Sequence, residues 1–128
     1  MILVDTSVVI DYTRGIDLKL QALLPTKPVA LCGVVRAEIL CGARNPADRS
    51  NILTELAAFQ YVPTPEALWD AVGDNLAELR RNGLTVPFPD AVIATLGIDL
   101  DVEVWSRDPH FPSMQRILPA LKLFQEPQ

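Results

Sequence analysis

Residues 1–15 read MILVDTSVVIDYTRG, a stretch that predicts a buried strand passing directly into a helix. The segment Ile2 to Val4 is short and apolar, as is typical of a strand that is covered on both faces. From Thr6 onward the apolar residues recur near helical spacing. Asp5 lies between the two elements, at the carboxyl end of the strand, where open α/β sheets bind their ligands. Asp5 is therefore a candidate site residue, although the same position suits a carboxylate that caps the helix.

The composition predicts one folded domain over residues 1–128. The chain is 49% hydrophobic and 21% charged, which excludes a disordered segment and a coiled coil. The sequence shows neither an apolar run near the ~20 residues of a membrane span nor the pattern of a signal peptide, so we expect a cytoplasmic protein. The net charge of −5 argues against a protein that coats nucleic acid through a broad basic surface. A nuclease remains compatible with this charge, because its acids would gather around a metal.

The few cysteines and histidines exclude a closed zinc site within one chain. Cys32 and Cys41 are the only cysteines and His110 is the only histidine, whereas a structural zinc site needs four such ligands. We expect both cysteines to be buried and reduced. His110 has no nucleophile partner in the sequence, so we expect it to pack or to form a hydrogen bond rather than to act as a general base.

Short strands and longer helices alternate along the rest of the chain. Two further strands are predicted at residues 28–32 (PVALC) and 103–106 (EVWS). Apolar spacing and terminal breakers predict helices at 34–43, 48–59, 65–82 and from Pro89 through Leu96, with Gly97-Ile98-Asp99 leaving the end of the last one undefined. Strands separated by helices indicate an α/β fold, in which a central parallel sheet lies between two helical layers.

Four acids lie where an unpaired carboxylate needs compensation. Asp5 ends the first strand, and Asp108 follows the strand at 103–106 in the same way. Glu38 lies within an apolar helical segment, and Asp90 opens the helix that follows Pro89. In a parallel sheet the carboxyl ends of the strands share one edge with the beginnings of the helices that follow them. We therefore expect these four side chains to converge.

A converging set of carboxylates predicts a divalent cation. Four carboxylates within about 5 Å of one another would repel by roughly 3 kcal/mol per pair at an effective dielectric constant of about 20. Oxygen ligands suit the hard ions Mg²⁺ and Mn²⁺, and Mg²⁺ commonly binds substrate phosphate oxygens as well. The set thus points to phosphate-ester chemistry. Taken singly, Asp5 and Asp90 could be helix caps, Asp108 a turn residue and Glu38 part of a polar stripe.

Four segments in this order resemble the PIN-domain ribonucleases, and specifically the VapC-type toxins of bacterial toxin–antitoxin pairs. The segments are VDTSVVIDY (4–12), VVRAEILCGA (34–43), PDAVIATLG (89–97) and WSRDPHF (105–111). The resemblance implies that Asp5, Glu38, Asp90 and Asp108 form the metal site and that Ser7 helps to hold it. It also implies a PIN-like α/β/α fold and an endoribonuclease that hydrolyses RNA by water activated by Mg²⁺ or Mn²⁺. The implied partners are a VapB-type antitoxin and a second copy of the chain.

Several roles and functions stay open on the sequence alone. Ser7 could donate to a ligand carboxylate, contact the phosphate, or serve only as a cap in the first turn of the helix. Arg107 could contact the RNA backbone. Asp11 is interpreted as peripheral. A non-catalytic RNA- or protein-binding module would use the same fold, and an acidic pocket would also suit a receiver domain or a haloacid-dehalogenase-like phosphatase. The phosphatase needs a second Asp where Ser7 stands, and the receiver needs a late lysine, for which only Lys122 is available.

Overall fold

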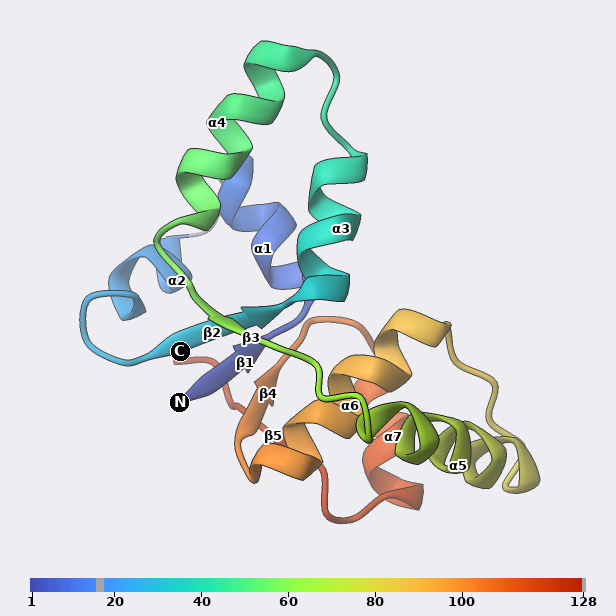
Figure 1. Ribbon diagram of the computed structural model, residues 1–128. Coiled ribbons are helices and arrows are strands. Elements are labelled where there is room, and N and C mark those ends of the chain that lie inside the picture. Colours follow the sequence, from blue (N-terminus) through green and yellow to red (C-terminus); the bar gives the residue numbers. More distant parts are fainter. Residues whose placement is uncertain (16–17, 128) are drawn as a thin grey trace.

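The computed structural model describes residues 1–15 and 18–127, and within them five short strands form one parallel sheet (Figure 1). The strand order is β3-β2-β1-β4-β5. The central strand β1 is fully buried, as expected from its continuous apolar sequence. The strands are β1 (Ile2–Val4), β2 (Val29–Cys32), β3 (Gln60–Val62), β4 (Glu103–Trp105) and β5 (Lys122–Leu123).

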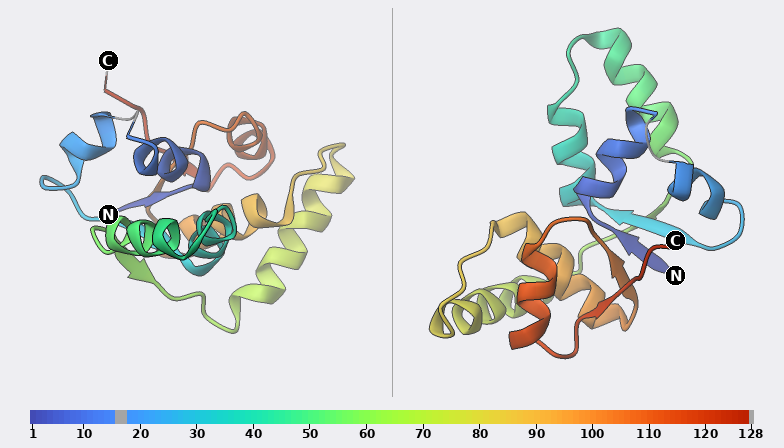
Figure 2. Two further views of the ribbon diagram at one scale, coloured as in Figure 1. Left: turned by 90° about the horizontal axis from the view of Figure 1, so that it is seen from above. Right: turned by 180° about the vertical axis from the view of Figure 1, so that it is seen from behind.

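Seven helices in the described ranges cover the two faces of the sheet, as Figure 1 and the view from behind in Figure 2 show. One layer holds α1 (Thr6–Thr13), α2 (Leu18–Leu23), α3 (Gly33–Cys41) and α4 (Pro46–Leu56). The other layer holds α5 (Leu68–Arg81), α6 (Phe88–Leu100) and α7 (His110–Ile117). The structure therefore has the three-layer α/β/α arrangement that the sequence predicts. None of the helices in these ranges is both long enough and apolar enough to cross a membrane.

The sequence predicted the larger elements and missed the smaller ones. The predicted strands correspond to β1, β2 and β4, and the predicted helices to α1, α3, α4, α5 and α6. The elements without a clear sequence pattern are α2, β3, α7 and β5. Two of these, β3 and β5, are strands of three and two residues at the edges of the sheet. A strand that short and that exposed has too few residues to display an alternating pattern.

Helix α6 is buried along most of its length and carries a glycine that its packing requires. Every residue from Asp90 to Gly97 is buried, which fits a helix whose sequence is apolar all round. A Cβ atom at Gly97 would overlap the side chain of Val104 in β4, so only glycine allows this close approach. The helix continues through Gly97 and ends at Asp101, whose φ of 55° is left-handed. Gly97 thus lets α6 lie directly on the sheet.

The two cysteines differ in exposure. Cys32 is buried at the end of β2, and this burial raises the pKa of its thiol. Cys41 is exposed, so the prediction that both cysteines are buried is wrong. The buried face of α3 carries Val35 and Ile39. Two residues correspond to about 200° of rotation along a helix of 3.6 residues per turn, so Cys41 lies on the side opposite Ile39.

Candidate metal and active site

Asp5 lies directly after the central strand and is almost fully buried, with 3% of its surface exposed. Its backbone N–H donates to the carbonyl of Trp105 at 2.9 Å, so the β1–β4 ladder runs up to this residue. Its Oδ2 atom accepts hydrogen bonds from the hydroxyls of Ser7 and Ser106, each at 2.7 Å, and from the backbone N–H of Ser7 at 3.4 Å. Asp5 is therefore the cap of α1 and, at the same time, a buried carboxylate at the edge of the sheet.

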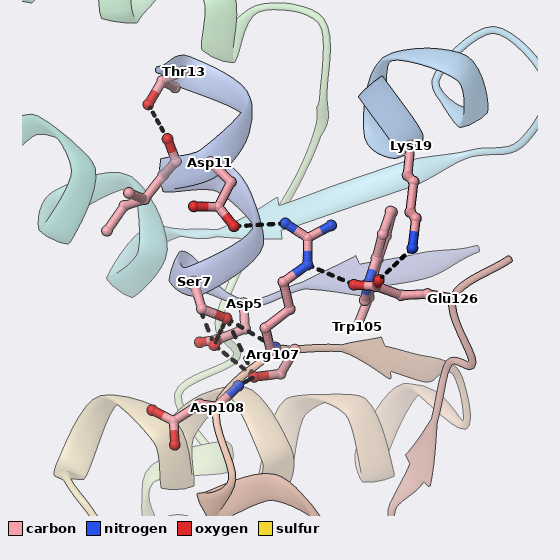
Figure 3. Close-up of polar contacts among 11 residues, drawn as sticks. Asp5, Ser7, Asp11, Thr13, Lys19, Trp105, Arg107, Asp108 and Glu126 are labelled. Atoms are coloured by element: carbon pink, nitrogen blue, oxygen red, sulfur yellow. Dashed lines mark hydrogen bonds and ion pairs between the residues drawn. The ribbon is translucent and has the colours of Figure 1, made fainter. Parts of the chain in front are cut away.

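The two serine hydroxyls also hold the segment that follows β4 (Figure 3). The backbone N–H of Arg107 donates to Ser7 Oγ at 3.0 Å. The backbone N–H of Asp108 donates to Ser106 Oγ, also at 3.0 Å. Each hydroxyl thus accepts from this segment and donates to Asp5, so the positions of Asp5 and Asp108 are linked.

Asp90 and Asp108 meet around His110. The Nδ1 atom of His110 lies 3.0 Å from Asp90 Oδ2 and 2.9 Å from Asp108 Oδ1. Asp90 lies in the first turn of α6, and His110 begins α7. These three side chains offer possible ligand atoms that all lie within 4.8 Å of one another. The expected hydrogen bond of His110 is present, and it places the imidazole inside the acidic cluster.

The electrostatics of the cluster favour a positive charge. Burial, and after it the negative charges of Asp5 and Asp108, raise the pKa of Asp90 to about 6 against the opposing effect of His110. Because burial and two neighbouring carboxylates both disfavour the ionised form of Asp90, a cation bound beside it would stabilise that form. Carboxylate oxygens with one imidazole are donors that divalent metals accept. The residues present therefore fit a divalent metal ion.

Glu38 lies apart from this cluster. Its side chain is exposed on α3, where Oε1 accepts a hydrogen bond from Thr6 Oγ1 at 2.7 Å. Among the described residues, the group of close ligand atoms comprises Asp90, Asp108 and His110 and does not include Glu38. Glu38 instead lines a cavity of about 560 Å³, between α1, α3 and α4, together with Arg14 and Arg44. The structure thus brings Asp5, Asp90 and Asp108 to one place and leaves Glu38 on an open rim.

Ser7 and Arg107 have different outcomes. Ser7 donates to the Asp5 carboxylate, which is one of the roles that the sequence left open. The Arg107 side chain extends to the opposite side of its backbone from Asp108, as Figure 3 shows. Its guanidinium pairs with Asp11 at 2.7 Å and with Glu126 at 2.5 Å. The interpretation of Asp11 as peripheral missed this ion pair.

The remaining members of the site could not be found by spacing alone. Ser106 and His110 flank Asp108 within one short segment, and a serine before an aspartate at the end of a strand repeats, in reverse, the order of Asp5 and Ser7. That similarity is a signal for Ser106. Glu126 follows β5, a strand that the sequence did not reveal, so no pattern placed it beside Arg107.

The four segments that carried the resemblance meet at this edge of the sheet, and a family model described as the PIN domain matches residues 2–117. The chain belongs to the PIN-domain family. Ribonuclease VapC10 from Mycobacterium tuberculosis is 30% identical over 127 residues, which cover 93% of this chain and 92% of that protein. The VapC-type PIN resemblance inferred from the sequence is confirmed.

Solved structures of similar proteins share the PIN fold. The structure of VapBC2 from Rickettsia felis, bound to a promoter DNA fragment, matches with a TM-score of 0.82 at 20% identity, covering 99% of this chain and 100% of that one. The structure of VapBC-1 from nontypeable Haemophilus influenzae matches with a TM-score of 0.81 at 15% identity, covering 98% of each chain. Similarity at this level of identity supports the PIN fold described above.

Proposed function

We propose that this PIN-domain protein is a metal-dependent endoribonuclease toxin that a VapB-type antitoxin neutralises. The observation that carries the proposal is the cluster of Asp5, Asp90 and Asp108 at the carboxyl edge of the sheet, with the pKa of Asp90 raised to about 6 by burial and by the two neighbouring carboxylates. The similarity to a protein named a ribonuclease, over nearly the whole chain, supports the reaction. The similar VapBC structures and a toxin–antitoxin complex from Klebsiella pneumoniae support the antitoxin partner. The proposal includes a cytoplasmic homodimer, as the resemblance implies.

The cation we propose is Mg²⁺ or Mn²⁺, held by Asp5, Asp90 and Asp108. Glu38 completes the set from the open rim of α3. Oxygen donors favour both ions, and the nearby imidazole of His110 is compatible with Mn²⁺. When bound, the cation supplies a Lewis acid that polarises the phosphate and lowers the pKa of the attacking water.

Neighbouring side chains orient the carboxylates of the proposed site. Water is the proposed nucleophile, because the chain has no pair of histidines that could activate the ribose 2′-hydroxyl. The hydroxyls of Ser7 and Ser106 both donate to Asp5 Oδ2, which fixes the direction of that carboxylate. His110 holds Asp90 and Asp108 together through Nδ1. Activation of the ribose 2′-hydroxyl commonly uses a general base together with a general acid for the leaving oxygen, such as a pair of histidines, and His110 is the only histidine. Attack by water leaves a 5′-phosphate and a 3′-hydroxyl.

The test is end-group mapping of a cleaved RNA by mass spectrometry, with and without EDTA. We expect 5′-phosphate and 3′-hydroxyl ends, loss of cleavage in EDTA, and continued cleavage when the 2′-hydroxyl at the cleaved position is replaced by hydrogen. The Asp90→Asn variant is the control for a contaminating nuclease. A 2′,3′-cyclic phosphate, or cleavage that persists in EDTA, would contradict the proposed mechanism. RNA binding without cleavage by the wild-type protein would favour a non-catalytic module.

A further inference from the structure

Arg107 is held between two carboxylates that come from distant parts of the chain. Asp11 lies in α1 and Glu126 lies after β5, and both pair with the guanidinium (Figure 3). The side chains of the three residues are only 27%, 33% and 27% exposed for Arg107, Asp11 and Glu126. A fork of donors that meets two carboxylates is fixed in direction as well as in distance. We call this set, Asp11, Arg107 and Glu126, the arginine brace.

The strand register places Glu126 in the brace. Glu103 and Val104 of β4 pair in parallel with Lys122 and Leu123 of β5. The chain after β5 keeps to this course, because the N–H of Phe124 donates to the carbonyl of Val104 at 2.9 Å. Continuing the register brings residue 126 beside residue 107.

Glu126 is itself fixed by further contacts. Trp105 Nε1 donates to its Oε1 at 2.8 Å, and Lys19 Nζ lies 3.2 Å from its Oε2. Burial alone raises the pKa of Glu126, but the hydrogen bonds from Arg107, Trp105 and Lys19 lower it to about 2. The carboxylate therefore stays ionised at neutral pH. The Arg107 guanidinium also lies 5.6 Å from the centre of the Trp105 ring, within the range of a cation–π contact.

We propose that Asp11 and Glu126 are positioning residues for the nuclease reaction, since through Arg107 they fix the segment from Ser106 to Asp108 and so the place of the Asp108 carboxylate. This inference rests on the proposed function. The segment is held on one side by the serine hydroxyls and on the other by the brace.

The electrostatics of the site explain the need for a brace. Asp108 shares the edge of the sheet with Asp5 and Asp90, and like charges at these distances repel one another. Without a cation, this repulsion favours conformations in which the segment after β4 moves outward. A brace that anchors the neighbouring residue opposes that movement, so that the ligand set is arranged before the metal arrives. Preorganisation of this kind increases affinity, because less order has to be imposed on binding.

The brace also gives Arg107 a role other than contact with RNA. An arginine whose charge is matched by two carboxylates would have to lose at least one of these ion pairs to bind a phosphate. The two roles predict opposite results when a carboxylate of the brace is removed. Release of Arg107 would strengthen RNA binding if Arg107 contacts RNA, and would disorder the Asp108 segment if it positions Asp108.

The experiment compares Glu126→Gln, Asp11→Asn and the double variant with the wild type and with Asp101→Asn. Asp101 is a matched control, because its ion pair with Lys122 at 2.7 Å is exposed and also involves the β5 strand. Three quantities are measured: hydrogen exchange of the Arg107 and Asp108 amides, the Mn²⁺ concentration at half of the maximal rise in melting temperature, and kcat and KM for RNA cleavage.

Each single variant is expected to raise amide exchange and the Mn²⁺ midpoint about threefold, the scale of a partly exposed ion pair, and the double variant about tenfold. We expect kcat to fall at subsaturating Mn²⁺ while the KM for RNA stays constant, and Asp101→Asn to behave as the wild type. Arg107→Lys, which can pair with one carboxylate but cannot fork between two, should give an intermediate result.

Unchanged exchange and an unchanged Mn²⁺ midpoint in the double variant would overturn the brace. A lower KM with constant kcat in Glu126→Gln would overturn it in favour of an RNA contact by Arg107. The amide exchange is read without metal or RNA. The exchange measurement therefore tests the arginine brace even if the wild-type protein fails to cleave RNA. Such a failure would refute only the proposed function.

Discussion

On the α6 side of the site Asp90 is 8% exposed and contacts His110, whereas on the α3 side Glu38 is exposed and accepts a hydrogen bond from Thr6. We call these the closed side and the open side. The closed side is built on a helix that is buried from Asp90 to Gly97, and its carboxylates are already close together. The open side borders a cavity of about 560 Å³. For the proposed metal site we therefore expect the closed side to determine where the cation binds and Glu38 to affect how tightly it is held.

The largest expected effect comes from Asp5→Asn at the base of the closed side. Loss of a group that only hydrogen-bonds to a metal ligand costs about 10–100-fold in metal affinity or activity. Removal of the charge of a ligand itself should therefore lower kcat/KM by more than about 100-fold. The Asn side chain can still accept from Ser7 and Ser106, so the melting temperature without metal should not fall. The measurements are a cleavage assay and a thermal melt. Retained metal-dependent cleavage, or a large loss of stability without metal, would show that Asp5 serves only as a cap.

The comparison of the two sides is sharpest in the response to Mn²⁺. At a hundredfold excess over the dissociation constant, a cation that binds only the native state stabilises it by about 2.7 kcal/mol. Asp90→Asn should remove most of this stabilisation. Glu38→Gln should lower the affinity for the metal about tenfold and so remove about 1.4 kcal/mol of this stabilisation. Thermal melts at several Mn²⁺ concentrations measure the stabilisation by Mn²⁺ in each variant. Equal losses of this stabilisation in the two variants would contradict the distinction between the closed and open sides.

A smaller effect is expected from Gly97→Ala, which disturbs the base of the closed side without changing a charge. A methyl group at this position overlaps Val104, and overpacking of a core typically costs about 1–3 kcal/mol. The better helix propensity of alanine offsets up to about 1 kcal/mol of that cost. Chemical denaturation measures the loss, with Gly73→Ala as the control, because nothing lies within 4 Å of a Cβ atom there. A more stable Gly97→Ala protein would contradict the close contact between α6 and β4.

A further expected effect is a pH dependence that belongs to Asp90. Its pKa of about 6 in the folded protein is above the ordinary value of 3.8. Between these values the folded protein binds more protons at Asp90 than the unfolded chain does, so this group lowers the free energy of unfolding as the pH rises from about 4 to about 6.

Asp90→Asn is the variant that isolates this contribution. The difference in unfolding free energy, wild type minus Asp90→Asn, should fall over this pH range in the presence of EDTA. Urea unfolding at closely spaced pH values measures it. A difference that rises with pH would mean that Asp90 is stabilised as a carboxylate, and the closed side would then have no excess negative charge.

The sequence was sufficient for the large elements and for the residues at their ends. Asp5 and Asp108 could be placed because each follows an apolar run, and Asp90 because a proline precedes it at the beginning of a helix. These signals are local. The three acids come together because the carboxyl ends of parallel strands share one edge of the sheet. The prediction for Glu38 used the same reasoning, but local sequence does not say how far a side chain on the next helix lies from that edge.

The contacts around Arg107 could not be predicted, because they depend on the tertiary arrangement of residues far apart in the chain. Asp11 approaches Arg107 from α1, and Glu126 approaches it from the segment after β5. The strand β5 has only two residues. Because the sequence did not predict β5, the register between β4 and β5 was unknown. The position of Glu126 beside Arg107 follows from that register, so it could not be predicted. His110 was missed as a member of the acidic cluster for a related reason, since α7 places it and a proline-flanked histidine shows no helical pattern.

The position of β1 between β2 and β4 has a consequence for the order in which the protein is made. The ribosome synthesises Asp5 before β4 and Asp108, which follow only after α6. At translation rates of about 5–20 residues per second, the interval from Asp5 to Asp108 lasts roughly 5–20 s. During this interval β1 lacks one of its two neighbours and the acidic cluster lacks a member. In a nascent chain the proposed metal site is therefore incomplete until translation has passed Asp108.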